Sequence, residues 1–399
     1  MKLAIVFADY LPAHQSKDPG LITQALGELG MHAAMVTESK VALHEEYIAS
    51  APFKIFQSAP GGLADVCIRE HFDTVIFYHG FSRRFSRDLA IFSTSKLPFI
   101  IKADSDGMIS PIPFYSELWK KEILLKRSLL GLLKVFAKKI TYSEQKSVLR
   151  RVLLANATII ESSKAKENLV KTLMLLNHKA HMLTEDEFAR MVSKLIIIPN
   201  PVAQIYSEVE SCRELREPMI TAIGRWDDPA KGSEKLMNAL RKVMSTNQKY
   251  SVQIIGPGDS IIHRYSRMWP MRYRSRLEIV GPAKPSEVRK RLLKSQILVS
   301  ASNWEGFPIS AGEALCSGNS LAAPPLPAFL DLVGERSQFG SIATENSAKY
   351  LAQAILKEIT CWNDGWRRPT DISGYWAKRL RPTTIARSII DVIRSMLSS

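Results

Sequence analysis

Residues 303–315 have the sequence NWEGFPISAGEAL. The apolar run ILVSA, residues 297–301, precedes it and predicts a buried parallel strand. Residues 310–316 predict a helix that ends at Gly318. The segment is therefore expected to form a strand, a loop and a helix, in that order.

Two glutamates stand eight positions apart in this segment. Glu305 is expected on the loop at the carboxyl end of the strand, where open α/β sheets bind their ligands. Glu313 is expected about one turn into the helix, and free backbone amides around residues 309–311 form an anion site at the helix start. This arrangement can hold hydroxyl groups and a phosphate together. An ordinary acidic helix start, favoured by the helix dipole, is the alternative interpretation.

The same order of elements recurs in ITAIGRWDDPAKGS, residues 220–233. Arg225 lies where a predicted strand ends, and Lys231 lies just before a helix whose apolar positions include Leu236 and Leu240. Two fixed cations then flank one anion, and together with helix amides they can stabilise its charge without a metal ion.

Both segments resemble the matching motifs of retaining glycosyltransferases of family four, which have the two-domain GT-B architecture. The resemblance implies that Glu305 contacts the transferred sugar and that Glu313 binds the ribose of the nucleotide. It also implies that Arg225 and Lys231 bind the diphosphate, and that the anomeric configuration of the sugar is retained.

The resemblance extends over most of the chain. IIIPNPV, residues 196–202, is similar to the segment that leads from the first domain to the second. VQIIGPGD, residues 252–259, is similar to the next strand and glycine turn, and Val280-Gly281-Pro282 to the loop near the base. The donor-binding residues that the resemblance implies are Gly224, Arg225, Lys231, Gly281, Glu305, Gly306, Phe307, Pro308, Ile309, Ser310 and Glu313. The predicted catalytic residues are Glu305, Arg225, Lys231, Asp104 and His79.

Apolar runs alternate with helical segments through both halves of the chain, which predicts parallel sheets covered by helices. The runs are residues 2–7, 33–36, 74–78, 98–101, 157–160, 195–198, 219–223, 252–255, 277–280, 297–301 and 320–322. A single core rarely grows beyond ~250 to 300 residues, and this chain has 399. We expect two doubly wound Rossmann-like domains, residues 1–200 and 201–374, which face a central cleft in the GT-B architecture. The resemblance implies that residues 375–399 form a helix that crosses back to the first domain.

Composition narrows the class of protein. The chain has 46% hydrophobic and 23% charged residues, as ordinary folded proteins do. No apolar run approaches the ~18 residues of a membrane span, and the N-terminal run is too short for a signal peptide. The four cysteines and eight histidines are scattered without metal-ligand spacing. We therefore expect a cytoplasmic protein with reduced thiols and no bound metal.

The charge is unusual, because 54 Lys and Arg against 39 Asp and Glu give a net +15. Such an excess favours a polyanionic partner. Residues 118–153 contain ten basic and two acidic residues, and on a helix the basic Lys120, Arg127, Lys134 and Lys138 lie opposite an apolar face. Either this helix packs on the core with its lysines in water, or it docks peripherally on the inner face of an anionic cytoplasmic membrane. No stacking aromatic motif accompanies the charge, which disfavours nucleic acid.

Acceptor contacts are expected on loops at the strand ends of the first domain. The candidates are residues 9–20, His79-Gly80 and Asp104-Ser105-Asp106-Gly107. Asp104 stands where many family members have a histidine. It either accepts a hydrogen bond from the acceptor hydroxyl or only caps the turn.

Three other functions remain open. The Asp104-Ser105-Asp106 segment matches the metal-binding Asp-x-Asp signature of the other large glycosyltransferase architecture, although that assignment leaves Arg225 and Lys231 without a role. A non-catalytic basic protein that binds membranes or RNA is a second option, and an epimerase or phosphorylase with the same fold is a third. We expect a glycosyltransferase that uses a UDP- or GDP-linked sugar, without a cofactor. Its acceptor is a hydroxyl of a glycan or lipid-linked molecule, in synthesis of cell-surface polysaccharide or glycolipid.

Overall fold

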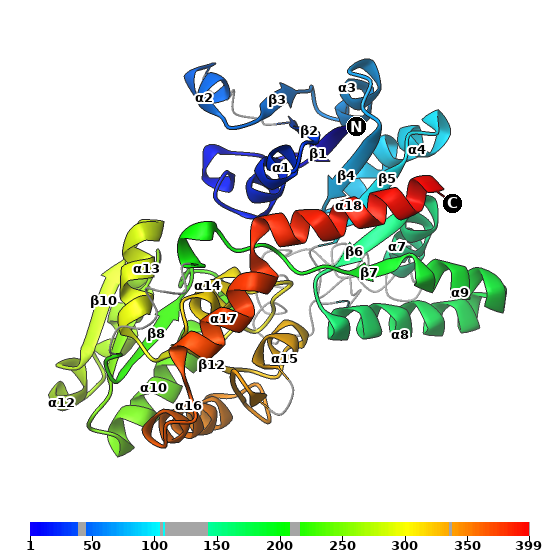
Figure 1. Ribbon diagram of the computed structural model, residues 1–399. Helices are drawn as coiled ribbons and strands as arrows, with labels where there is room; N and C mark the ends of the chain where they lie inside the picture. Colours follow the sequence, from blue (N-terminus) through cyan, green and yellow to red (C-terminus); the bar gives the residue numbers. More distant parts are fainter. Residues whose placement is uncertain (39–44, 104–106, 108–142, 208–215, 335–336, 399) are drawn as a thin grey trace, which may run out of the picture. The chain divides into compact units, whose positions relative to one another are not determined.

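The chain forms two compact units in the computed structural model (Figure 1). The structure describes residues 1–38, 45–103, 107, 143–207, 216–334 and 337–398. Of these, the residues up to 201 and the last helix, α18 (Pro382–Ser398), form the first unit. Residues 202–381 of the described part form the second. The division lies one residue after the expected boundary at residue 200.

The first unit is built on a parallel sheet of seven strands in the order β3-β2-β1-β4-β5-β6-β7. The strand order reverses between β1 and β4, where the chain has filled one half of the sheet and begins the other. The strands are β1 (Lys2–Val6), β2 (His32–Thr37), β3 (Lys54–Gln57), β4 (Thr74–Tyr78), β5 (Phe99–Lys102), β6 (Ala157–Ile160) and β7 (Leu195–Ile197).

Helices cover both faces of this sheet because its strands alternate apolar side chains between the two faces. Ile5 and Ile76 pack with α1 and α18, whereas Val6 and Phe77, the next residues along their strands, pack with α3 and α4. The helices are α1 (Asp18–Glu28), α2 (Glu45–Ser50), α3 (Leu63–Arg69), α4 (Ser86–Ser95), α7 (Ser143–Leu154), α8 (Ser163–Ala180) and α9 (Glu185–Ser193). Short 3-10 turns occur at Pro12–His14 and Arg83–Phe85.

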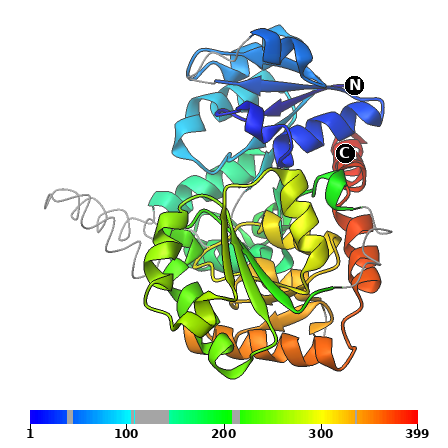
Figure 2. The same ribbon diagram turned by 90° about the vertical axis from the view of Figure 1, so that its left-hand side faces the viewer.

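The second unit is built on a parallel sheet of six strands in the order β10-β9-β8-β11-β12-β13, shown with its flanking helices in Figure 2. Its strand order reverses between β8 and β11. The strands are β8 (Met219–Ile223), β9 (Ser251–Ile255), β10 (Leu277–Gly281), β11 (Ile297–Val299), β12 (Ser320–Ala323) and β13 (Gly340–Ile342).

Two apolar clusters lie on opposite faces of the second sheet. Leu236 and Leu240 of α10 pack with Ile355 of α16 on one face. Phe307, Phe329 and Trp376 belong to the cluster on the other face. The helices are α10 (Ser233–Thr246), α11 (Asp259–Ser266), α12 (Met271–Arg274), α13 (Pro285–Lys294), α14 (Ile309–Cys316), α15 (Pro327–Val333), α16 (Ala348–Asn363) and α17 (Pro369–Leu380).

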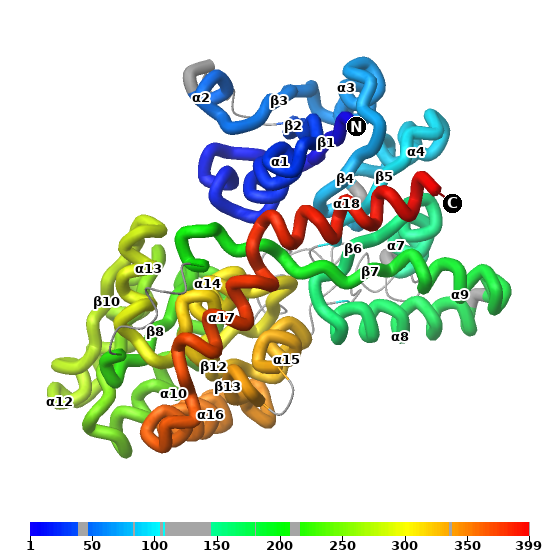
Figure 3. The backbone as a smooth tube through the Cα atoms, viewed as in Figure 1, coloured from blue at the N-terminus to red at the C-terminus, as the bar shows by residue number. Residues whose placement is uncertain are grey.

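The last two helices belong to different units, as the tube in Figure 3 lets the reader follow. Helix α17 packs on α14 in the second unit, with Trp376 and Leu380 buried. Helix α18 begins at Pro382 and packs on α1 in the first unit through Ile385, Ile389 and Ile393. Residue 375, the expected start of the returning helix, therefore lies inside α17, and the change of unit occurs seven residues later.

The predicted fold class, an α/β chain of two helix-covered parallel sheets, is confirmed. The prediction omitted two edge strands, β3 and β13. Strand β3 has the sequence KIFQ, in which two polar residues enclose only two apolar ones, and β13 is the three-residue GSI. Edge strands this short carry too weak a pattern for periodicity to detect. In the part of the chain that the structure describes, no helix combines the length and the hydropathy needed to cross a membrane.

Candidate active site

The carboxyl ends of β8 and β11 meet at the point where the strand order of the second sheet reverses. The two strands pair in parallel, with Ile297 opposite Ile220 and Val299 opposite Ala222. Residues 224–232 follow β8 and residues 300–308 follow β11, so both loops leave the same edge of the sheet. In open α/β sheets this is the place where ligands bind. It is also where Arg225, Lys231 and Glu305 lie.

The loop after β8 is fixed by backbone contacts with the loop after β9. Gly224 N donates to Ile255 O at 3.1 Å, and Trp226 N donates to Pro257 O at 2.8 Å. The buried Trp226 indole also donates to Ile255 O at 3.2 Å. At Gly256, with φ of 124°, a Cβ would lie 1.9 Å from Gly224 O. The glycine turn of residues 256–258 therefore has a packing role, which brings the loops after β8 and β9 together.

The loops after β8 and β11 are locked to each other by a close approach of their backbones. At Gly232, with φ of 62°, a Cβ would lie 2.2 Å from Ala301 O. Asn303 N donates to Ala230 O at 2.7 Å, and the Asn303 amide donates to Pro229 O at 2.9 Å. Only glycine fits both the left-handed backbone and this approach. The geometry of the two loops is therefore preorganised.

This lock brings Lys231 and Glu305 together, although they are 74 residues apart in sequence. Lys231 Nζ donates to Glu305 Oε1 at 2.5 Å, and the Ser302 hydroxyl donates to the same oxygen at 2.6 Å. The two charged side chains are 23% and 11% exposed. The pair is thus held in one geometry while it remains accessible to a ligand.

Arg225 lies on the same loop and is 70% exposed. Its guanidinium pairs with Asp228 Oδ2 at 3.1 Å, and the other oxygen of Asp228 accepts from Ala230 N at 2.9 Å. Asp228 caps the 3-10 turn Pro229–Lys231 in this way. The structure therefore presents one exposed and one half-buried cation on a single loop, each beside a carboxylate.

Lys235, which the sequence analysis did not single out, supports the site from the first turn of α10. Its ammonium donates to Asn303 Oδ1 at 2.7 Å, to Ser302 O at 3.3 Å and to the Asn346 side chain. It therefore fixes the loop that carries Glu305. A possible signal was its spacing, because Lys235 lies one helical turn after Lys231.

Helix α14 begins one residue earlier than predicted, at Ile309. Of the three amides predicted to bind an anion, that of Ala311 donates to Pro308 O at 2.9 Å and closes the first turn. The predicted anion site is therefore wrong for Ala311. Ile309, Ser310 and Glu313 are the partly exposed positions of this helix start, whereas Ala311 and Gly312 are buried.

Glu313 and Arg289 both lie near enough to Tyr206 for their charges to act on it. Burial of Tyr206, and next the charge of Glu313, raise the pKa of this phenol, while Arg289 acts in the opposite direction. The Tyr206 hydroxyl donates to Pro285 O at 3.3 Å. Glu313 thus lies near the start of α13 as well as on α14.

The remaining predicted donor residues contribute mainly backbone. Gly306, Phe307 and Pro308 are buried, and the Phe307 ring belongs to the apolar cluster beneath α14. Gly281 ends β10, with φ of 72°, and its carbonyl accepts from Gly256 N at 2.7 Å. It lies at the same edge of the sheet as Arg225, two strands away.

In the first unit, His79 follows β4 at the reversal of strand order between β1 and β4. It has a left-handed φ of 55°, its side chain is exposed, and its ring lies 5.2 Å from that of Phe7. The ring of His14 also lies near Phe7, 5.0 Å away between centroids. Burial lowers the pKa of His14, assisted by the charges of Lys17 and His79. Asp104 and Asp106 lie outside the described residues.

The basic segment of residues 118–153 is described only from Ser143 onward. The predicted docking residues Lys120, Arg127, Lys134 and Lys138 lie outside the described residues. Within α7, Arg151 is buried and donates to Phe81 O at 3.1 Å and to Ser86 Oγ at 2.8 Å. Arg151 therefore belongs to the packing of the unit and not to a basic surface.

A buried ionic network was also missed. Lys102 Nζ lies 3.1 Å from Asp18 Oδ2 and 3.2 Å from Glu161 Oε1, and it donates to the Asn200 side chain. These residues lie at the carboxyl ends of β5, β6 and β7 and at the start of α1. Over the described ranges, no group of three or more His, Cys, Asp or Glu side chains is placed to hold a metal ion.

Comparison with known proteins identifies relatives of both the second unit and the whole fold. Residues 217–360 match the family model of Glycosyl transferases group 1. A phosphatidyl-myo-inositol mannosyltransferase of Propionibacterium freudenreichii is 31% identical over 145 residues, which are 36% of this chain and 35% of that protein. The chain thus spans about a third of the length of this curated relative.

Two solved structures match over nearly the whole chain. HepE of Anabaena, crystallised with UDP, has a TM-score of 0.66 at 14% identity and covers 99% of this chain and 100% of its own. Sucrose-phosphate synthase of Thermosynechococcus elongatus has a TM-score of 0.65 at 13% identity and covers 100% of this chain and 99% of its own. At this identity the likeness shows the fold. The whole chain therefore has the GT-B fold, and residues 217–360 of its second unit are similar to the group 1 glycosyl transferases.

Proposed function

We propose that the protein transfers a sugar from a nucleoside diphosphate to a hydroxyl group of a glycan or lipid-linked acceptor. The observation that carries the proposal is the Lys231–Glu305 pair, held at 2.5 Å where the strand order of the group 1 unit reverses. A cation and a carboxylate in contact suit a substrate in which a sugar adjoins a phosphate. The cation can then bind the phosphate of the donor, and the carboxylate can bind its sugar.

The proposed roles follow from where each group lies. Lys231 and Arg225 stabilise the charge that develops on the phosphate oxygen as its bond to the anomeric carbon breaks. Glu305 accepts hydrogen bonds from sugar hydroxyls, and Glu313 binds the ribose. The acceptor oxygen forms the new bond to the anomeric carbon and loses its proton. The proposal also includes retention of the anomeric configuration of the sugar. Asp104 and His79 are placed in it on the acceptor side.

The similar proteins support a class of acceptor and a class of donor for this proposal. One is named for mannosyl transfer to phosphatidyl-myo-inositol, which favours a lipid-linked acceptor such as one used in cell-surface polysaccharide or glycolipid synthesis. The Anabaena structures were obtained with UDP and with UDP-glucose, which favours a nucleoside-diphosphate donor. A lipid-linked acceptor would place the enzyme peripherally at the cytoplasmic membrane.

The first test identifies the donor. UDP- and GDP-linked sugars are added to the purified protein, and its thermal unfolding midpoint is measured. A ligand at about a hundred times its dissociation constant adds ~2.7 kcal/mol to stability. Glu313→Ala should abolish the shift, whereas Lys294→Ala, which changes an exposed residue of α13, should preserve it. If no sugar nucleotide raises the midpoint of the wild type, the proposal fails.

The second test concerns the chemistry. With the donor identified, transfer to an acceptor should persist in excess chelator, because protein cations occupy the place of a metal. Loss of transfer that Mg²⁺ or Mn²⁺ restores, together with an inactive Asp106→Ala variant, would instead support the Asp-x-Asp mechanism. Analysis of products separates the other chemistries, since an epimerase returns a sugar nucleotide and a phosphorylase returns a sugar phosphate. A donor that binds without turnover would favour a non-catalytic protein.

A further inference from the structure

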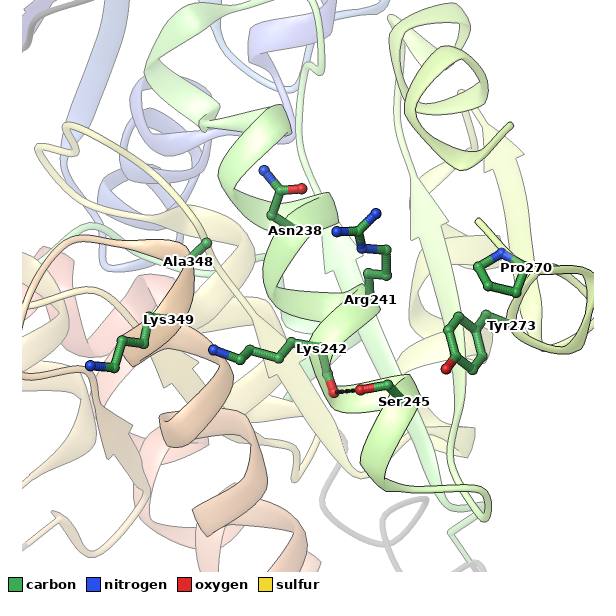
Figure 4. Close-up of a pocket in the computed structure, with 8 residues that line it drawn as sticks. All are labelled: Asn238, Arg241, Lys242, Ser245, Pro270, Tyr273, Ala348 and Lys349. Carbon is green, nitrogen blue, oxygen red and sulfur yellow. Dashed lines mark hydrogen bonds between the residues drawn. The ribbon is translucent and has the colours of Figure 1, made fainter. Parts of the chain in front are cut away.

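A basic groove of about 500 Å³ lies on the second unit, away from the loops that carry Lys231 and Glu305. Helix α10 supplies Asn238, Arg241, Lys242 and Ser245 to its walls, α12 supplies Tyr273, and α16 supplies Lys349 (Figure 4). Arg241 lies eight residues beyond Ser233, the first residue of α10, which is about 12 Å along a helix at 1.5 Å per residue. The groove is therefore a second feature of this unit, separate from the candidate active site.

The three cations of the groove have no acidic partner. In the described part of the chain, no carboxylate lies within 4.0 Å of the charged atoms of Arg241, Lys242 or Lys349. All three side chains are exposed at the surface of the unit. In Figure 4, Lys242 extends from α10 toward the start of α16, where Lys349 lies, and Arg241 and Tyr273 line the other side. Cations gathered without carboxylates favour an anionic ligand.

Two exposed apolar side chains lie within two residues of Pro270, which lines this groove. They are Met268 and Met271, which are 68% and 71% exposed. Their neighbours Trp269 and Tyr273 are buried in the apolar core of the unit. The segment is thus anchored, and the two methionines are presented to the surroundings by a fixed backbone.

The same segment is strongly basic. Residues 264–274, with the sequence RYSRMWPMRYR, contain four arginines and no acidic residue. Arg264, Arg267, Arg272 and Arg274 are exposed. A surface that combines phosphate-binding cations with exposed apolar side chains matches the interface of an anionic bilayer, where phosphates lie above the acyl chains.

We propose that this face of the second unit docks on an anionic lipid bilayer, with a lipid phosphate in the groove and Met268 and Met271 in the acyl boundary. A soluble anion gives no role to the exposed methionines. Single-stranded RNA prefers exposed aromatic side chains on which bases stack. Of the three aromatic residues of this segment, Trp269 and Tyr273 are buried and Tyr265 is partly buried against the same core. The proposal requires neither a particular donor nor sugar transfer.

Sedimentation of the full-length chain with vesicles tests this surface. The vesicles contain phosphatidylglycerol in phosphatidylcholine, and pure phosphatidylcholine is the reference. The groove variant combines Arg241→Glu, Lys242→Glu and Lys349→Glu. The matched control combines Lys290→Glu, Lys294→Glu and Lys378→Glu, which are exposed residues of α13 and α17. Both sets change the formal net charge equally, so a difference between them reports on position and not on total charge.

We expect the groove variant to bind the anionic vesicles at least about tenfold more weakly than the wild type, and the control to change by no more than about twofold. Met268→Ser combined with Met271→Ser should also weaken binding, by about threefold or more, without any change of charge. Equal loss in the two charge variants would overturn the proposal, because diffuse attraction would then explain the binding. Unchanged binding of the methionine variant would overturn insertion and with it the proposed docking.

Two further measurements keep the result interpretable. Thermal unfolding midpoints of all variants should lie close to that of the wild type, because the replaced side chains are exposed. Binding of a short single-stranded RNA is measured with the same proteins. If the groove variant loses RNA binding but keeps vesicle binding, the groove belongs to a nucleic-acid site and the proposal is wrong. Residues 118–153 are unchanged in every variant, so their contribution is constant.

Discussion

Each of the two sheets has a lysine-carboxylate contact at the carboxyl ends of its strands. One of them, the sealed contact, is buried, and the other, the open contact, is partly exposed. Lys102 in the first unit is 1% exposed and lies between Asp18 and Glu161. Lys231 in the second unit is 23% exposed and meets Glu305 alone among the described carboxylates. The same chemical groups therefore serve two purposes. The sealed contact joins elements of the fold, and the open one is available to a ligand.

The different burial of the two lysine-carboxylate contacts explains their different purposes. Burial alone would lower the pKa of Lys102, but the adjacent charges of Asp18 and Glu161 outweigh it and raise the pKa above its ordinary value. The buried Tyr78 adjoins the same network, and its pKa is raised first by burial and then by Asp18. Loss of one member leaves the other charges buried without compensation. The Lys231–Glu305 pair is partly exposed, so water or a phosphate can replace one partner at a lower cost than in the buried network.

The largest expected effect therefore comes from breaking the sealed contact. Lys102→Met should destabilise the first unit by ~3 to 5 kcal/mol, because Asp18 and Glu161 would remain buried without the Lys102 charge between them. Thermal unfolding followed by circular dichroism measures the change. Lys231→Met is the matched control, and its midpoint should stay near that of the wild type. If the two variants unfold at the same temperature, the distinction between sealed and open contacts is wrong.

The open contact should matter for chemistry instead. Lys231→Ala should lower the rate of transfer by about 100-fold, equivalent to ~2.7 kcal/mol of transition-state stabilisation, because a fixed cation no longer faces the leaving phosphate. Steady-state kinetics with the identified donor measure this effect. The Lys294→Ala variant should retain the wild-type rate. A Lys231→Ala enzyme with undiminished turnover would remove Lys231 from the donor site.

A third expectation concerns the backbone lock that creates the open contact. Gly232→Ala should destabilise the second unit by ~1 to 3 kcal/mol, because its left-handed φ of 62° and the Ala301 carbonyl 2.2 Å away both exclude a Cβ. It should also weaken donor binding, since the two loops must move apart. Gly374→Ala in α17 is the control, because a Cβ there meets nothing within 4 Å. That control should be neutral or slightly stabilising. Equal stability of the two variants would contradict the lock.

The two lysine-carboxylate contacts show what the sequence does and does not predict. Apolar runs predicted most of the strands, since each run is long enough to show its pattern, and the loops that carry Arg225, Lys231 and Glu305 follow those strands. The ion pair between Lys231 and Glu305 was not predicted. It arises because β11 lies beside β8, a pairing between distant segments that local pattern does not determine, and this pairing joins residues 74 positions apart.

The sealed network was harder to predict for the same reason. Lys102 ends the run FIIK, where a lysine is typical of a strand that reaches the surface. Its partners Asp18 and Glu161 come from other parts of the chain, and each is unremarkable alone: one begins a helix and the other follows a strand. Only the parallel order of β4, β5 and β6 brings these charges together. Burial of a charge depends on that assembly and is not encoded at a single position.

The smallest expected effect is that of replacing His14. This residue follows β1 at the carboxyl ends of the strands of the first sheet, and its side chain is partly buried. Burial, then Lys17 and His79, lower its pKa below 6.5, and its Nδ1 accepts a hydrogen bond from Leu11 N at 2.9 Å. Between the folded and the unfolded pKa, the unfolded chain binds more protons at His14. Stability should therefore fall as the pH is lowered through 6.5 toward the folded pKa. His14→Asn keeps an acceptor but does not titrate, so its stability should depend less on pH in this window. NMR titration of the ring measures the pKa directly, and a value at or above 6.5 would show that His14 is as open to water as an ordinary surface histidine.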